Sequence, residues 1–259
     1  MNVLTTRVVL RERTLAEVFD LAFRFVAVRG GRKYLRLWLF SCAPLLGVCV
    51  WLRYAQVDWV WVWLAACIGF VIAQIPFTLA ASRLLLGDDL SLRSLASAWL
   101  PRIPGQILMH AAAAVLLGIT GFVIVPIPFL AARFLYLPEI SLLEGSGLIR
   151  AYERGSRLSR NRLAHALETS LLLLTVWAAF ILGAEVLGRS IQDDLLSLPP
   201  PADALVDGGS WFALCGFFAA VPFLATARFL AYIDGRTRRE AWDVQLRFTE
   251  LAKSPQRTA

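Results

Sequence analysis

Residues 107–137 read ILMHAAAAVLLGITGFVIVPIPFLAARFLYL, and the path of this apolar stretch decides the fold. It has 31 residues, whereas a helix that spans a bilayer needs about 20. A single kinked helix would carry the next loop to the far side of a membrane, and a tight hairpin that turns near Gly118–Gly121 would return it. Because loops rich in Lys and Arg stay cytoplasmic, the sequence favours the hairpin. The loop contains Arg150, Arg154, Arg157, Arg160 and Arg162.

Four further apolar segments each approach the length that a bilayer requires. The sequence therefore predicts an all-α integral membrane protein with six transmembrane helices, arranged as three hairpin-like repeats with cytoplasmic amphipathic helices. A cytoplasmic amphipathic segment (1–34) precedes the transmembrane domain (35–231), and a cytoplasmic basic tail (232–259) follows it. The six spans are approximately 35–52, 59–81, 107–118, 121–137, 166–187 and 211–231.

The distribution of basic residues predicts the orientation. With six spans, every one of the 26 Lys and Arg residues except Arg53 and Arg189 lies on one side. The positive-inside rule makes that side cytoplasmic, so both termini are expected in the cytoplasm of a multi-pass protein of the inner (plasma) membrane. The first apolar run follows a long polar and basic stretch, so we expect it to remain as an anchor and not to be cleaved as a signal peptide.

Composition bounds the class of partner. The chain is 58% hydrophobic and only 17% charged, with a mean hydropathy of +0.63, whereas soluble domains are about 45–50% apolar and 25% charged. The net charge is +7, and the basic residues flank the apolar runs. Anionic lipid headgroups are therefore the expected partner, in preference to nucleic acid. A membrane-protein partner is also possible on these grounds.

Three stretches share a pattern in which a proline precedes an arginine and then an acidic residue. Each proline should kink or break its helix and free a backbone carbonyl that lipid cannot satisfy. The arginine is expected at headgroup depth, where its stem can snorkel. Two interpretations stay open: a gate or headgroup clamp, and a helix terminus with an anchoring charge. The members are Pro76, Arg83 and Asp88; Pro128, Arg133 and Glu139; and Pro222, Arg228 and Asp234.

Amphipathic helices are expected beside the spans. Thr14 and Glu17 fit a capping box, and apolar residues then recur at helical spacing up to Val26. Another surface helix is expected after the last span, near Trp242–Thr249. Between the fourth and fifth spans, basic residues on one helical face could contact anionic lipid or could serve only as an orientation signal. The candidate residues facing lipid or a partner are Arg133, Arg150, Arg154, Arg157 and Arg228.

The sequence contains no recognisable catalytic motif, and we expect neither an enzyme nor a cofactor or metal site. Cys42, Cys49, Cys67 and Cys215 lie in apolar segments and are expected to be buried free thiols. His110 and His165 are expected to be structural. Two polar residues within spans are candidates for function: Glu185, as a proton or cation relay, and Gln74, which could equally form interhelical hydrogen bonds.

Two segments resemble a known group of proteins. The run LPEISLLEGSGLIRAYERGSRLSRNRLAHAL (137–167) has Pro138, Glu139, Glu144, Ala151, Ser156 and Ser159 at the relevant places. The run YIDGRTRREAWDVQLR (232–247) has Asp234, Arg236, Arg238, Arg239, Glu240 and Asp243. Together they resemble the bacterial multi-pass proteins grouped with the glycerophosphodiester phosphodiesterase membrane domain. The resemblance covers the second half of the chain and implies a helical membrane module of unknown activity. The hydrolase activity of such enzymes belongs to a separate soluble barrel domain, for which this chain has no room.

Three functions remain to be weighed. The preferred one is a non-enzymatic inner-membrane module that organises lipid or a partner protein through a basic cytoplasmic face. The alternative is a small transporter or channel-like protein that uses its proline-broken helices as a pathway. The third is a lipid-modifying enzyme, although the sequence offers no acid–base or metal constellation for it.

Overall fold

Long apolar runs form most of the helices, and Pro44 and Pro76 lie inside two of them. The computed structural model describes residues 14–86, 91–120, 130, 133–145, 147–159, 163–197 and 204–240. This described part is 90% helical and contains no strand. The expected tail helix near Trp242, the repeat proline Pro128 and the acidic residue Asp88 lie outside it.

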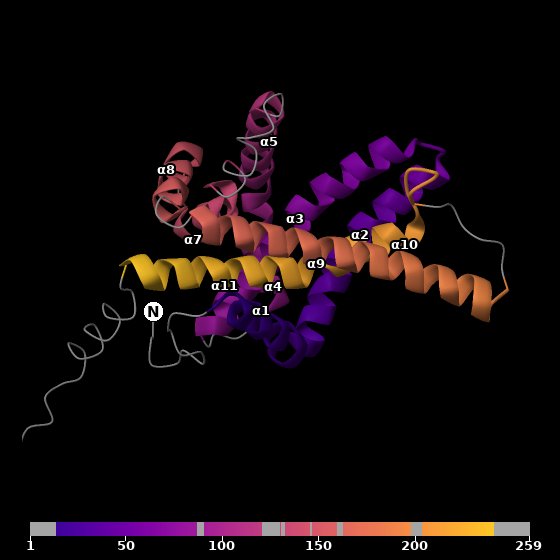
Figure 1. The fold of residues 1–259 in the computed structure, drawn as a ribbon, viewed down its shortest axis with the longest axis horizontal. Coiled ribbons are helices and arrows are strands. Elements are labelled where there is room, and N and C mark those ends of the chain that lie inside the picture. Colours follow the sequence, from indigo (N-terminus) through magenta and orange to yellow (C-terminus); the bar gives the residue numbers. More distant parts are fainter. Residues whose placement is uncertain are drawn as a thin grey trace, which may run out of the picture.

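The described helices follow one another in the order drawn in Figure 1. They are α1 (Leu15–Arg24), the π-helical turn η2 (Phe25–Gly30), α2 (Gly31–Tyr54), α3 (Trp59–Leu86), α4 (Leu92–Trp99), the 3-10 turn η3 (Leu100–Arg102), α5 (Ile103–Thr120), α7 (Leu137–Glu144), α8 (Leu148–Ser159), α9 (Leu163–Ser190), the π-helical turn η4 (Ile191–Leu195), α10 (Trp211–Ala219) and α11 (Val221–Glu240).

Five helical stretches of the described part are long and apolar enough to cross a membrane. The expected all-α fold is confirmed for the described residues, and the five candidate spans are compatible with the expected multi-pass membrane protein. Within the most apolar window of each stretch, 78% of α10–α11 and 61% of α3 are buried, against 6% for α9 and 11% for the α5 stretch. The centre of the molecule is therefore α3 with α10–α11, and α5 projects from it (Figure 1). The five stretches are Leu15–Tyr54, Trp59–Leu85, Leu92–Ile119, Leu163–Leu195 and Trp211–Thr237.

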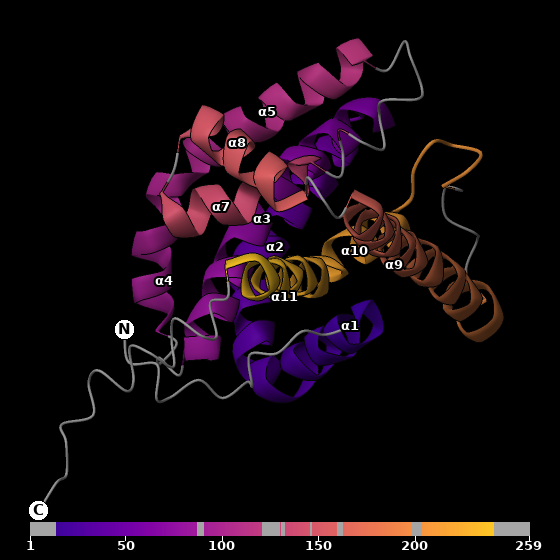
Figure 2. The same cartoon turned by 60° about the vertical axis from the view of Figure 1, so that its left-hand side comes forward.

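The first helix has the predicted start and a buried apolar face. The Thr14 hydroxyl accepts from the Glu17 backbone N–H, and the Glu17 carboxylate accepts from the Thr14 backbone N–H, which forms the expected capping box. Val18, Phe19 and Ala22 form the buried side of α1. This side packs on α11, next to it in Figure 2, where the rings of Phe19 and Phe223 are 5.9 Å apart. The amphipathic stripe of α1 thus contacts protein.

The two ends of the 107–137 stretch come together. Met109 and Leu137 belong to one buried cluster, whereas a continuous helix would place them about 40 Å apart at a rise of 1.5 Å per residue. A single straight helix through the stretch is therefore incompatible with the packing. Helix α5 includes Gly118, Ile119 and Thr120, and the second predicted limb, 121–137, falls mostly outside the described residues.

Two helix prolines free backbone carbonyls, and two tryptophan side chains satisfy these carbonyls. Because Pro76 has no N–H, the carbonyl of Ile72 loses its helical partner, and it accepts from the Trp99 indole N–H at 3.0 Å. Pro222 likewise frees the carbonyl of Phe218, which accepts from the Trp38 indole N–H at 2.9 Å. The donors come from α4 and α2, so each freed carbonyl links two elements. The proline positions noticed in the sequence therefore mark connections between helices.

The four cysteines are not all buried. Cys42 and Cys49 are buried free thiols, as expected, but Cys67 on α3 and Cys215 on α10 are exposed on the helix surfaces. Apolar surroundings in sequence did not distinguish the inward from the outward faces of these spans, because both faces of a membrane helix are apolar.

Candidate functional site: a buried arginine cluster beside a cavity

Arg228 lies in α11 at the centre of a buried polar cluster. Its Nε donates to the Glu139 carboxylate at 2.5 Å, and its Nη2 donates to the Gln74 side-chain oxygen at 2.6 Å. The Glu139 side chain is fully buried and the Arg228 side chain is only 14% exposed. The cluster therefore joins α11, α7 and α3 through a charge-assisted pair and an interhelical hydrogen bond.

The same cluster extends to α5 and fixes the protonation of His110. Because the Gln74 oxygen accepts from Arg228, the Gln74 amide nitrogen is the donor toward His110 Nε2, 3.1 Å away. His110 Nε2 is then an acceptor, and its Nδ1 carries the proton that it donates to the Gln106 carbonyl at 2.8 Å. The cluster thus holds a neutral imidazole in one tautomer.

Local sequence explains how Glu139 reaches the cluster. Pro138 stands in the first turn of α7, where its missing N–H removes nothing from the helix. Glu139 follows in that same turn, where the helix dipole favours a carboxylate. Gly145, with φ of +64°, ends α7 in the left-handed conformation that glycine adopts readily. The short helix is therefore terminated at both ends by residues suited to those positions.

The pKa of the Glu139 carboxyl is subject to two opposing effects. Complete burial raises this pKa, while the Arg228 guanidinium acts in the opposite direction. At a contact of 2.5 Å the ion pair is the state that the geometry supports. The second carboxylate oxygen has no hydrogen-bond partner among the described residues.

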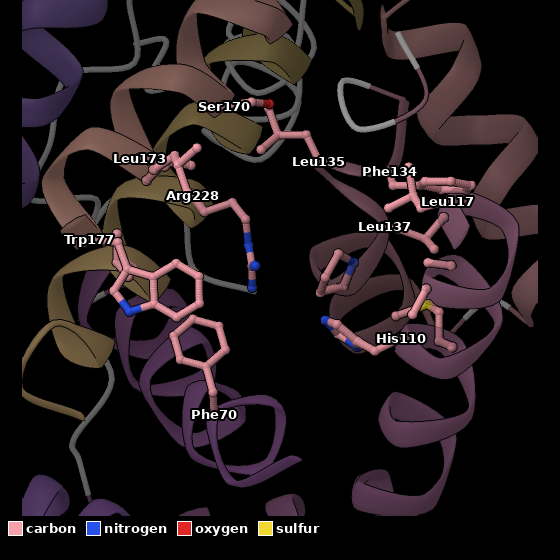
Figure 3. A pocket seen from close by; sticks show the side chains of 16 residues that line it. Phe70, His110, Leu117, Phe134, Leu135, Leu137, Ser170, Leu173, Trp177 and Arg228 are labelled. Atoms are coloured by element: carbon pink, nitrogen blue, oxygen red, sulfur yellow. The ribbon is translucent and has the colours of Figure 1, made fainter. Parts of the chain in front are cut away.

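A cavity of about 550 Å³ lies beside the cluster, between α5, α9, α11 and residues 134–138. Arg228 and His110 extend toward one another across it, from α11 and α5, in Figure 3. Its remaining wall is mostly apolar and includes the rings of Phe70 and Trp177, which are stacked 4.9 Å apart. Among the described residues that line the cavity, Arg228 carries the only charge. The arrangement combines an apolar chamber with a cationic end.

A second polar cluster lies around Glu144 at the end of α7. The Glu144 carboxylate pairs with Arg154 of α8 at 2.5 Å and with Arg236 of α11 at 3.6 Å. It also accepts from the Tyr232 hydroxyl at 2.6 Å. These contacts fix α7 and α8 against the end of α11.

Glu185 lies at the opposite end of the molecule and is only 9% exposed. Its carboxylate accepts from Arg189 at 2.8 Å, from the Ser210 hydroxyl, and from the Ala204 backbone N–H at 3.3 Å. Ser210 in turn caps α10 by accepting from the Ala213 N–H. These contacts hold the end of α9 against the start of α10. They give Glu185 a structural role, which is the alternative to the role of an ion relay.

The predicted site residues fall into three environments. Arg133, Arg150 and Arg157 are exposed, and Arg154 is bound to Glu144. Arg228 differs from the expectation of a lipid-facing side chain, because Glu139 and Gln74 draw it into the interior. Gln74 makes the interhelical hydrogen bonds that the sequence allowed.

Sequence reasoning missed the partners of Arg228. Glu139 was visible as the acidic member of the second repeat, without an assigned partner, and it pairs with Arg228 of the third repeat. His110 was expected to be structural, and it forms hydrogen bonds within the cluster and also lines the cavity. A useful signal would have been that His110 and Glu139 lie near opposite ends of the apolar stretch 107–137, which the predicted hairpin brings together.

In comparisons with known proteins, no family model, no curated protein and no solved structure matches the chain. The resemblance to the glycerophosphodiester phosphodiesterase membrane domain group therefore stays a prediction.

Proposed function

We propose that this protein is a non-enzymatic integral module of a bacterial inner membrane, with six spans in three hairpins and both termini cytoplasmic. In this proposal the module organises anionic lipid, or a partner protein, through a basic cytoplasmic face. The exposure of three arginines around α8 is the observation that carries the proposal.

The orientation is supported by a chain of contacts between the two exceptional arginines. The Arg53 guanidinium lies 5.3 Å from the Trp59 ring, and a Cβ on Gly209 would meet that ring at 2.3 Å. Gly209 precedes Ser210, which binds Glu185, and Glu185 binds Arg189. Arg53 and Arg189 therefore share one end of the molecule, in agreement with a single outer face.

The three-hairpin arrangement is supported by the recurring tryptophan contacts. Trp99, which precedes the second predicted hairpin, binds the carbonyl freed by Pro76 in the first. Trp38 of the first hairpin binds the carbonyl freed by Pro222 in the third. A tryptophan thus binds the freed carbonyl at two of the three repeat prolines, and each contact joins segments assigned to different hairpins.

The basic face is built on α8. Ala151 and Gly155 form the buried side of this helix, and a Cβ on Gly155 would lie 3.2 Å from the Arg133 carbonyl oxygen. The close approach turns Arg150 and Arg157 outward, next to Ile149, which is 72% exposed. An exposed apolar residue beside exposed cations suits a helix at a membrane interface.

The test compares two triple variants that remove equal charge. Replacing Arg133, Arg150 and Arg157 with Gln spares the pair of Arg154 with Glu144; the matched control replaces the exposed Arg32, Arg36 and Arg93. Each basic residue near an anionic surface contributes about 1 kcal/mol, so we expect the first variant to retain at least about tenfold less phosphatidylglycerol from mixed nanodiscs at low salt. Retention is counted by native mass spectrometry. Equal losses in both triples would show that only total charge matters and would overturn the proposal.

The transporter alternative is favoured by one specific observation. Hydrogen bonds connect Glu139, Arg228, Gln74 and His110 in a continuous series beside the cavity. Gln74 in this series lies two residues before Pro76. Ion or substrate flux into liposomes that Gln74→Ala abolishes would favour this alternative. Flux that responds to Glu185→Gln alone would point to the end of α9 instead. A lipid-modifying enzyme would require activity on a lipid panel that survives stringent purification.

A further inference from the structure

We propose that the cavity beside Arg228 binds one amphiphile that has an acidic head and a single acyl chain. The site is internal and separate from the basic face on α8. It deepens the proposed function, on which it rests, by naming a second lipid site and the chemistry of its ligand.

The head is assigned from the hydrogen-bond donors of Arg228. A guanidinium has five N–H groups; Nε uses one on Glu139 and Nη2 uses one on Gln74. Among the described residues, no partner takes the remaining three. Polar hydrogens without an acceptor are costly in an apolar environment, and a head that only accepts hydrogen bonds would satisfy them. Carboxylate and phosphate monoester groups have this property and carry the complementary charge.

His110 and Ser170 in the wall are already engaged, and the Trp177 indole N–H, which has no partner among the described residues, can only donate; these facts narrow the ligand further. His110 Nε2 accepts from Gln74 and His110 Nδ1 donates to Gln106. The Ser170 hydroxyl donates to the Ala166 carbonyl at 2.8 Å and can therefore only accept. A head that needs acceptors as well as donors, such as an alcohol or a sugar, would find few in the described wall. Among the described residues of the wall, Arg228 is the only charged group that can select the head.

The tail is assigned from the shape and chemistry of the wall. The cavity follows α5 from Met109 to Leu117, a rise of about 12 Å, which is roughly the depth of one leaflet of a hydrocarbon core about 30 Å thick. Its volume of about 550 Å³ is within the usual range for small-molecule sites, roughly 300–1,000 Å³. Phe70 and Trp177 provide a flat apolar wall on the side opposite α5. One acyl chain matches this space.

The binding experiment uses the full chain, delipidated in detergent and titrated by native mass spectrometry. The probes are oleic acid, 1-oleoyl lysophosphatidic acid and oleyl alcohol, which share one tail. We expect one equivalent of an acidic probe to bind with a Kd at least about tenfold below that of the alcohol. The two acidic probes distinguish a fatty acid from a phospholipid-derived ligand. Equal binding of alcohol and acids, or no binding of any probe, would overturn the proposal.

Matched alanines on α5 test the location of the tail. Ala113 lines the cavity, whereas Ala111 is exposed and does not. Ala113→Phe should raise the Kd of the acidic probes at least about tenfold, and Ala111→Phe should leave it within twofold. If the two variants behave alike, the cavity is not the site. A change of oligomeric state in Ala113→Phe alone would mean that a second copy of the chain occupies the cavity, and would also overturn the proposal.

A double variant tests the head without leaving a buried charge. Arg228→Met combined with Glu139→Leu removes both partners of the pair, and should reduce the acid-over-alcohol preference to threefold or less while the affinity for the alcohol stays unchanged. A preserved preference would contradict the role of Arg228. The triple variant of Arg133, Arg150 and Arg157 should bind the acidic probes normally, so failure of the surface proposal can be distinguished from failure of this one.

Discussion

Arg228 keeps a positive charge in the interior because two side chains accept hydrogen bonds from its guanidinium. Glu139 provides the compensating charge, and Gln74 carries the connection on to His110. Removing one member of a buried ion pair typically costs about 3–5 kcal/mol, whereas removing both is often neutral. The pair therefore matters to stability chiefly as a unit.

The first prediction concerns this pair. Arg228→Met should lower the free energy of unfolding by about 3–5 kcal/mol, because Glu139 is left buried and unpaired. Adding Glu139→Leu should restore most of the loss. The measurement is unfolding in mixed micelles of SDS and a mild detergent. As a control, Arg24→Met removes a pair with Asp20 whose side chains are 72% and 58% exposed, and should change stability by less than about 1 kcal/mol. A single variant as stable as the wild type would contradict the role of the pair.

At the scale of elements, the helices are joined where their own hydrogen bonding fails. Pro76 and Pro222 each leave a carbonyl unpaired, and Trp99 and Trp38 supply the missing donor from another helix. An unsatisfied carbonyl at membrane depth is expensive. The contacts therefore favour one register of each helix against its neighbour.

The second prediction tests the tryptophan contacts with a mutant cycle. Trp38→Phe should cost about 1–3 kcal/mol of unfolding free energy, because the Phe218 carbonyl loses its donor. In a Pro222→Ala background the cost should be smaller, since residue 222 regains an N–H that can reach the same carbonyl. The exposed Trp61 provides the control, and Trp61→Phe should change stability by less than about 0.5 kcal/mol. Equal costs in the two backgrounds would refute the explanation.

The third prediction concerns the close packing of α9 and α10. A Cβ on Gly216 would lie 2.4 Å from the Phe180 backbone oxygen, whereas a Cβ on Gly183 meets nothing within 4 Å. Gly216→Ala should destabilise the protein, because backbone must move to make room. Gly183→Ala in the adjacent helix should be neutral or stabilising by up to about 1 kcal/mol, through helix propensity. Thermal unfolding in detergent compares them, and the opposite order would refute the packing argument.

At the scale of the whole molecule, one end gathers Arg53, Trp59 and Arg189, and the other gathers Glu144, Arg154 and Arg236. The end with Arg154 also carries the exposed Arg133, Arg150 and Arg157, and segments rich in Lys and Arg face the cytoplasm. The proposed topology follows from this separation.

The fourth prediction is a labelling pattern in intact cells. In a background where Cys42, Cys49, Cys67 and Cys215 are replaced by alanine, a cysteine at Arg53, Gly118 or Arg189 should react with a membrane-impermeant maleimide. A cysteine at Arg150 or Arg157 should react only after the cells are opened. Removal of Cys67 and Cys215 is essential, because both are exposed. Protection at Gly118 together with labelling at Arg157 would contradict the hairpin topology.

The sequence predicted what depends on neighbouring residues and on composition. The Thr14–Glu17 capping box is a local pattern, and its two hydrogen bonds are present. The pairing of Glu139 with Arg228 spans 89 residues, and the repeat pattern indicated no partner for either side chain. The partners of the freed carbonyls were equally hidden, because a tryptophan in an apolar run gives no sign of where its N–H points. Both depend on which helices become neighbours, and that is settled only by tertiary packing.

The burial of α1 against α11 also has a consequence for biosynthesis. Phe19 is made early and its partner Phe223 is made late. At about 5–20 residues per second, the ribosome needs roughly 10–40 s to cover that separation. During this interval Val18, Phe19 and Ala22 have no docking surface, although the later-made α11 eventually covers them. Helix α1 is therefore made long before α11, the helix against which it finally packs.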